Sequence, residues 1–136
     1  MNDEKFFKGL VAALATSGVE FIDTRGDRHQ VAVRRAIDLL RDLQESGTAG
    51  ATSMPRALLP RPVTGAYEEF DDALLRLQDL GYDSAQNPYY PGVALTPIRH
   101  RAERILSRFS KEEQEVFAGL AQAFNSGSGV PTVQTA

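Results

Sequence analysis

Hydrophobic side chains recur every three or four residues over much of this chain, which is the spacing of one face of an α-helix. The clearest case is residues 27–46, which begin at Asp27, a capping residue, and stop before Gly47. Gln30 lies three positions after Asp27, where its side chain can bond back to the start of the helix. The apolar stripe of this segment consists of Val33, Ala36, Ile37, Leu40 and Leu43. We expect a helix that packs this stripe on a core.

A second amphipathic run precedes this helix. Residues 3–16 place apolar side chains on one face, and Gly18 follows as a residue that readily adopts the left-handed conformation that ends helices. The segment after it is ambiguous, because Val19 and Phe21 alternate as in a strand while Ile22 breaks the alternation. We therefore expect a first helix followed by an ordered connector.

The C-terminal half contains signals for three more helices. Thr96 is a capping residue, and Pro97 follows it at the first helical position, where proline is tolerated. Ser110 and Glu113 have the spacing of a capping box. With the apolar spacing, these signals predict helices over residues 66–80, 97–109 and 111–124. The expected fold is mainly α, with about five helices in one small domain.

Residues 47–64 interrupt the helical spacing with three prolines and two glycines. Loops of this length inside a compact domain are uncommon, and they are usually either functional or disordered. If this loop binds a partner, its expected contacts are Arg56, Leu58, Leu59 and Arg61. A mobile linker is the alternative. The last residues, 125–136, have the composition of a flexible tail, so the expected domain covers residues 1–124.

Composition narrows the function mainly by exclusion. The 136 residues carry a net charge of −3, which argues against a chain built mainly to bind nucleic acid or an anionic membrane. The sequence has no cysteine, which excludes disulfides and thiolate catalysis and fits a reducing compartment. No apolar run approaches the about 18 residues that a membrane span needs. We therefore expect a cytoplasmic protein with no membrane partner.

Residues for catalysis or metal binding do not form a recognisable pattern. The two histidines, His29 and His100, are not spaced as metal ligands, and no serine has an evident base beside it. An acidic cluster could in principle hold a hard cation, but its members fan around one predicted helix: Glu68, Glu69, Asp71 and Asp72. We expect neither an enzyme nor a protein with a metal or a cofactor.

Residues 66–109 resemble the second half of a winged helix-turn-helix domain of the MarR or PadR type. In these families a recognition helix ends in a Leu-x-x-Leu-x-x-x-Gly-Tyr pattern, a two-stranded wing follows, and Leu-Thr-Pro starts the next helix. The matching residues are Leu74, Leu77, Gly81, Tyr82, Leu95, Thr96 and Pro97. The resemblance implies a short two-stranded wing near residues 82–95 and a dimer interface on the helix after it.

The charges in this region are segregated. The helix that would enter the DNA groove, residues 66–80, carries five acidic residues against Arg76 alone, which disfavours DNA reading through this helix. Basic residues instead form a face after the predicted wing: Arg99, Arg101, Arg104 and Arg108. This face could contact phosphate, pair with the acidic helix of this or another copy, or be a solvated surface.

These observations favour a non-enzymatic protein–protein interaction module: an adaptor, a regulator or a subunit of a larger assembly. Tyr89 and Tyr90 lie in a proline-rich turn, and tyrosine is enriched at interfaces, although these two could instead cover an end of the core. The expected partner is another protein or a second copy of the chain. The alternative is a winged-helix DNA-binding transcription regulator, and an enzyme with an unfamiliar site is a third option.

Overall fold

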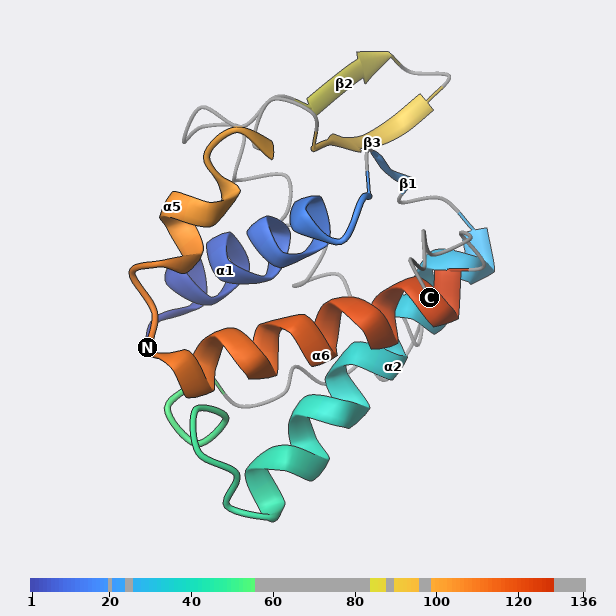
Figure 1. Cartoon of the computed structure of the whole chain (residues 1–136). Coiled ribbons are helices and arrows are strands. Elements are labelled where there is room, and N and C mark those ends of the chain that lie inside the picture. The colour runs from blue at the N-terminus through green and yellow to red at the C-terminus, as the bar shows by residue number, and fades with distance from the viewer. Residues whose placement is uncertain (20, 24–25, 56–83, 88–89, 96–98, 129–136) are drawn as a thin grey trace.

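The computed structural model describes residues 1–19, 21–23, 26–55, 84–87, 90–95 and 99–128. These residues form four helices and a three-stranded sheet (Figure 1). In chain order the elements are α1 (Asp3–Thr16), β1 (Phe21–Asp23), α2 (Gly26–Glu45), β2 (Ser84–Asn87), β3 (Tyr90–Ala94), α5 (Ala102–Leu106) and α6 (Lys111–Ser128). The prediction of a mainly helical protein is confirmed.

Helix α1 has the limits that its sequence predicts, and both ends are capped. The side chain of Asn2 accepts a hydrogen bond of 2.8 Å from the backbone N–H of Lys5, which satisfies one of the free donors at the helix start. At the other end, Gly18 has a φ of 98°, and the N–H of Val19 bonds back to the carbonyl of Leu14 at 3.1 Å. This is the left-handed glycine termination that the sequence predicts.

The core lies where the long helices meet, with α6 packed against both α1 and α2 (Figure 1). Phe117 of α6 is fully buried and contacts the rings of Phe6 and Phe109, at centroid distances of 5.7 and 4.9 Å. The largest fully buried side chains are Phe117, Leu10, Leu14, Leu95, Leu120, Val11 and Val33. Leu95 directly follows β3, so the sheet is joined to the helical core by a buried side chain.

The strands form an antiparallel sheet with the order β1–β3–β2. Strand β1 pairs with β3 in the register Phe21 to Ala94, and β2 pairs with β3 in the register Ser84 to Val93. The expectation of a connector after α1 is therefore wrong over β1, which at three residues is too short for a side-chain period to show. Strands β2 and β3 fall within the predicted wing, residues 82–95, but β3 also pairs with β1. A separate two-stranded wing is not seen among the described residues.

The described part of the chain holds four helices where the sequence predicts five. The predicted helix over residues 66–80 lies outside the described residues. The predicted helix over 97–109 is reduced to α5, and residues 96–98 are not described. The N–H groups of Arg108 and Phe109 bond to carbonyls three residues back, which closes the turn after α5. The backbone must leave the helix there, because Ser110 caps α6 and a capping residue is not helical.

The beginning of the proline- and glycine-rich loop is packed rather than free. Ala51 is fully buried and Met54 is 5% exposed, so both belong to the core. The side-chain amide of Gln44, on α2, donates to the carbonyls of Ala51, Met54 and Pro55 at 3.3, 3.3 and 2.8 Å. Gly50 has a φ of 89°, and a Cβ there would lie 2.6 Å from the backbone of α6. The mobile-linker alternative is therefore wrong for residues 47–55, and residues 56–64 are not described.

Helix α6 is longer than predicted and ends at Ser128. The sequence predicts a flexible tail from residue 125, but residues 125–128 are helical. Asn125 is 3% exposed, and its side-chain amide donates to the Ser17 hydroxyl at 3.2 Å, which ties this turn of α6 to the end of α1. A tertiary hydrogen bond thus offsets the weak helix propensity of the Asn-Ser-Gly-Ser sequence.

Candidate functional site

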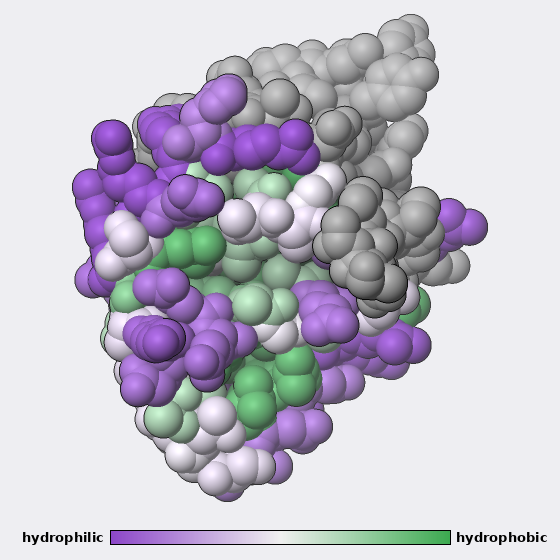
Figure 2. Space-filling view, viewed as in Figure 1, coloured by the Kyte–Doolittle hydropathy of each residue, from purple (hydrophilic) through white to green (hydrophobic). Residues whose placement is uncertain are grey.

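The predicted basic face lies on and around α5. Arg99, Arg101, Arg104 and Arg108 are described, and all four are exposed. Three of them, Arg101, Arg104 and Arg108, recur every three or four residues and therefore share one side of this segment. In the space-filling view, hydrophilic side chains gather over α5, beside patches of apolar surface (Figure 2). The structure thus brings together most of the face that the sequence predicts.

These arginines form one wall of a surface hollow of about 340 Å³. The other wall comes from α1, which packs against α5. We call this hollow the cationic groove, and its lining residues are Lys5, Lys8, Arg101, Arg104, Ile105, Arg108 and Phe109. The groove therefore joins side chains that are about one hundred positions apart in the sequence.

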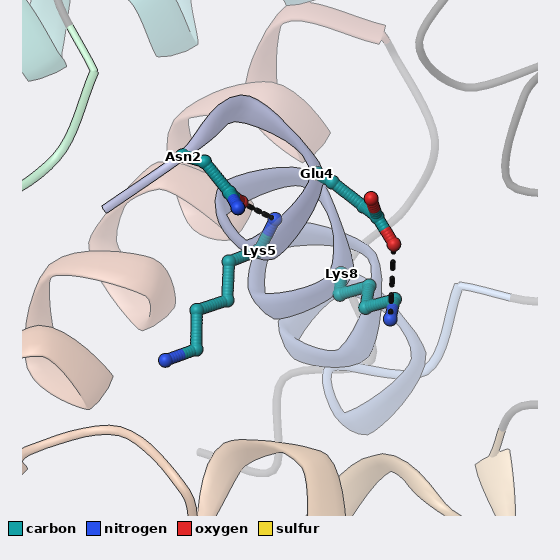
Figure 3. Close-up of polar contacts among 4 residues, drawn as sticks. All are labelled: Asn2, Glu4, Lys5 and Lys8. Carbon is teal, nitrogen blue, oxygen red and sulfur yellow. Dashed lines mark hydrogen bonds and ion pairs between the residues drawn. The ribbon is translucent and has the colours of Figure 1, made fainter.

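Lys5 and Lys8 reach the groove because they are three residues apart on α1 and share a side of that helix. Beyond Lys8, residues 9–15 of α1 are all buried in the core, so the two lysines extend from the exposed first turns of this helix. Lys8 Nζ lies 3.4 Å from Glu4 Oε1, whereas the Lys5 side chain extends away from this pair (Figure 3). Exposed pairs of this kind are worth only about 0.3–0.5 kcal/mol, so Glu4 does not hold Lys8 in place.

The groove concentrates positive charge on a chain whose net charge is −3. Five of its seven lining residues are basic, and none is acidic. Within the described part of the chain, Glu4 is the only carboxylate at ion-pair distance from Lys5, Lys8, Arg104 or Arg108. Like charges held close together attract an anion more strongly than one cation does, so the arrangement favours a ligand with several negative groups.

The floor of the groove is apolar. Ile105 is partly buried and packs on the core, and Phe109 is 8% exposed. The ring of Phe109 lies edge-on to Phe117 with a centroid distance of 4.9 Å, so the floor is anchored to the centre of the molecule. The stems of lysine and arginine add further apolar surface around it. A ligand that carries both carboxylates and an apolar side chain would match this combination.

Glu113 lies just beyond the groove, at the start of α6. The Ser110 backbone N–H donates to Glu113 Oε1 at 2.9 Å, and the Ser53 hydroxyl donates to Glu113 Oε2 at 2.9 Å. The Ser110 backbone N–H is the main cause that lowers the pKa of this carboxyl, and the Ser53 and Ser110 hydroxyls and the positive charge of Lys5 add to it against the opposing effect of burial. Glu113 is therefore a structural carboxylate that fastens the loop to the capping box of α6.

Of the remaining predicted contacts, Tyr90 is the one that lies among the described residues. Tyr90 begins β3, where it pairs with Asn87. Tyr89 lies outside the described residues, and so do the four contacts predicted in the loop: Arg56, Leu58, Leu59 and Arg61. The sequence does not indicate Lys5 and Lys8 as site residues, because its only signal for them is their polar character within the first helix. The α1–α5 contact that makes them part of a site is visible only in the fold.

No family model, no curated protein and no solved structure matches this chain.

The described residues contain no group of three or more histidines and carboxylates placed to hold a metal ion. His29 is buried, with its ring edge-on to Phe124 at a centroid distance of 6.0 Å. None of the described helices is long and apolar enough to cross a membrane. The functional argument therefore rests on the groove.

Proposed function

We propose that this chain is a non-enzymatic protein–protein interaction module that acts as an adaptor, a regulator or a subunit of an assembly. The observation that supports this proposal is the cationic groove, in which positive walls enclose an apolar floor. Such a combination provides electrostatic attraction for an acidic partner and a surface on which the partner can bury an apolar side chain.

The chemistry of the lining favours binding over catalysis. Lysine and arginine attract anions, but the seven lining residues include no histidine, carboxylate or hydroxyl that would act as a general base or nucleophile. Lys5 is exposed, and Lys8 is half-buried beside the carboxylate of Glu4, so neither lysine has the wholly apolar surroundings that turn lysine into a base.

Affinity capture from the native lysate, with nuclease present, tests this function. We expect a defined set of proteins to be retained by the wild-type chain and lost with the double variant Arg104→Glu/Arg108→Glu. The control is Arg35→Glu, an exposed position on α2. Failure of the wild-type chain to retain any protein would contradict the function. A partner retained equally by all variants would support an interaction module whose contact lies away from the groove.

The second candidate function is a winged-helix DNA-binding transcription regulator. The observation that favours it is the order of β2, β3 and a basic helical segment, in the place where the resemblance puts a wing and the helix after it. This function predicts that duplex binding weakens with salt, by about 0.9 log units per neutralised phosphate for each tenfold increase. Arg101→Ala/Arg104→Ala should then weaken binding to all duplex sequences. Unchanged binding in that variant would exclude this use of α5.

A further inference from the structure

We propose that the cationic groove is the docking site for an acidic amphipathic helix of a protein partner. In this proposal, aspartate and glutamate side chains of the partner contact the basic walls while one apolar side chain covers Ile105. The inference rests on the proposed function and specifies the chemistry of the partner. Three features of the groove support it: the spacing of the basic residues, the mixed walls and floor, and the size of the hollow.

The spacing of the basic residues suits a helical ligand. Arg101, Arg104 and Arg108 follow one another at intervals of three and four residues, and Lys5 and Lys8 at an interval of three. On α1, Lys5 and Lys8 lie about 5–6 Å apart along one helix face, whereas Arg101 and Arg108 flank the short helix α5. Carboxylates three residues apart on a partner helix would therefore match the spacing of the two lysines, and carboxylates on its adjoining side could reach Arg104 and Arg108 across the groove. Arginine adds two parallel hydrogen bonds to a carboxylate where geometry allows.

The apolar floor of the groove favours a peptide over a purely ionic ligand. Ile105 is partly buried on the core and belongs to the lining, and in the sequence it lies between Arg104 and Arg108 of the same lining. A simple anion would leave this apolar surface in water, whereas a leucine or phenylalanine of a partner helix would cover it. Helix-in-groove complexes use such apolar anchors at helical spacing.

Nucleic acid fits the same groove less well. A hollow of about 340 Å³ takes a few side chains, whereas a duplex presents a broad convex surface. Single strands bind by stacking bases on exposed aromatic rings, and the one aromatic ring in the lining, Phe109, is only 8% exposed. The net charge of −3 also repels a long polyanion outside the groove.

The test is fluorescence anisotropy of the full chain with synthetic labelled peptides. The main probe is a helical peptide with glutamates on one side and leucines on the adjoining side. Two matched controls replace every glutamate by glutamine, or every leucine by serine. A short DNA duplex and inorganic tripolyphosphate complete the set. We expect the acidic amphipathic peptide to bind most tightly, the glutamine peptide not to bind, and the serine peptide to bind more weakly.

Variants locate the binding in the groove. Arg104→Glu/Arg108→Glu should weaken the acidic peptide by about tenfold or more, and Lys5→Glu should weaken it from the other wall. Arg35→Glu should bind as the wild type does. Thermal unfolding of each variant shows whether it is folded. If the double arginine variant does not fold, Lys5→Glu still tests whether the peptide binds in the groove.

Three results would overturn the inference: equal binding of the glutamine peptide, wild-type affinity in the folded groove variants, or tighter groove-dependent binding of the duplex or of tripolyphosphate. Absence of binding to every probe would also overturn it. None of these results removes the proposed function, because affinity capture of a partner is independent of the probe peptides. If the peptides did not bind and affinity capture also retained no protein, the inference and the proposed function would both be contradicted.

Discussion

A glycine in the middle of α1 illustrates how one atom of side chain can matter to this molecule. A Cβ at Gly9 would lie 2.4 Å from Cζ of Phe117, a contact that requires the helices to move. Glycine costs about 0.5–1 kcal/mol in a helix interior, so close packing is the reason for its presence. We expect Gly9→Ala to destabilise the protein by about 1–3 kcal/mol, measured by urea unfolding.

The matched control is Gly119→Ala on α6. There the new Cβ would have its nearest neighbour, Leu39 Cδ2, at 3.8 Å, which is ordinary contact. Helix propensity should then dominate, and the variant should gain about 0.5–1 kcal/mol. Equal stability of the two alanine variants would show that α1 and α6 are less closely packed than the Gly9 contact indicates.

At the residue scale, Glu113 also leads to a prediction about how the stability of the protein depends on pH. The Ser110 backbone N–H and the other contacts of this carboxylate lower its pKa below the ordinary value of 4.5. A carboxyl group with a lowered pKa stabilises the folded state above its unfolded pKa, and this stabilisation is lost as pH falls through the folded pKa. We expect Glu113→Gln to reduce stability at neutral pH, and the difference from wild type to shrink at and below about pH 4. Urea unfolding at several pH values measures this, and a constant difference would contradict it.

At the scale of elements, the side chain of Gln44 fastens the loop after α2 to this helix. Its amide reaches three backbone carbonyls of residues 51–55, and these would lose a partner in Gln44→Ala. We expect a loss of about 1–2 kcal/mol, with faster hydrogen exchange at the Ala51 and Met54 amides than in the rest of the protein. The exposed Gln122→Ala on α6 is the control. Uniform exchange effects over the whole chain would contradict a local role.

The elements also show which parts of the fold can be predicted from the sequence. Helices α1 and α2 follow from period and caps within about a residue, because both signals are local. Strand β1 cannot be predicted in this way, because three residues are too few to show the alternation of side chains in a strand. It also pairs with β3, which lies about seventy residues further along the chain. The length of α6 depends on the bond between Asn125 and Ser17, which is equally non-local. The arginine half of the groove was predictable, but its lysine half required the packing of α1 on α5.

At the scale of the whole molecule, the groove exists only in the folded chain. Its basic residues come from α1 and from the segment around α5, and unfolding would separate them. The unfolded chain, with a net charge of −3, offers an acidic peptide no comparable concentration of cations. A ligand that binds the folded state alone stabilises it by RT ln(1 + [L]/Kd), about 2.7 kcal/mol at 100 times Kd.

We therefore expect the acidic amphipathic peptide to raise the thermal midpoint of the wild-type chain as its concentration increases. The Arg35→Glu variant should show the same shift, because α2 takes no part in the groove. The Lys5→Glu variant should show a much smaller shift at equal peptide concentration, since one wall then repels the ligand. A shift of equal size in Lys5→Glu would mean that the peptide binds elsewhere on the folded surface. A lowered midpoint would mean that the peptide prefers the unfolded chain, which the separation of the groove cations on unfolding argues against.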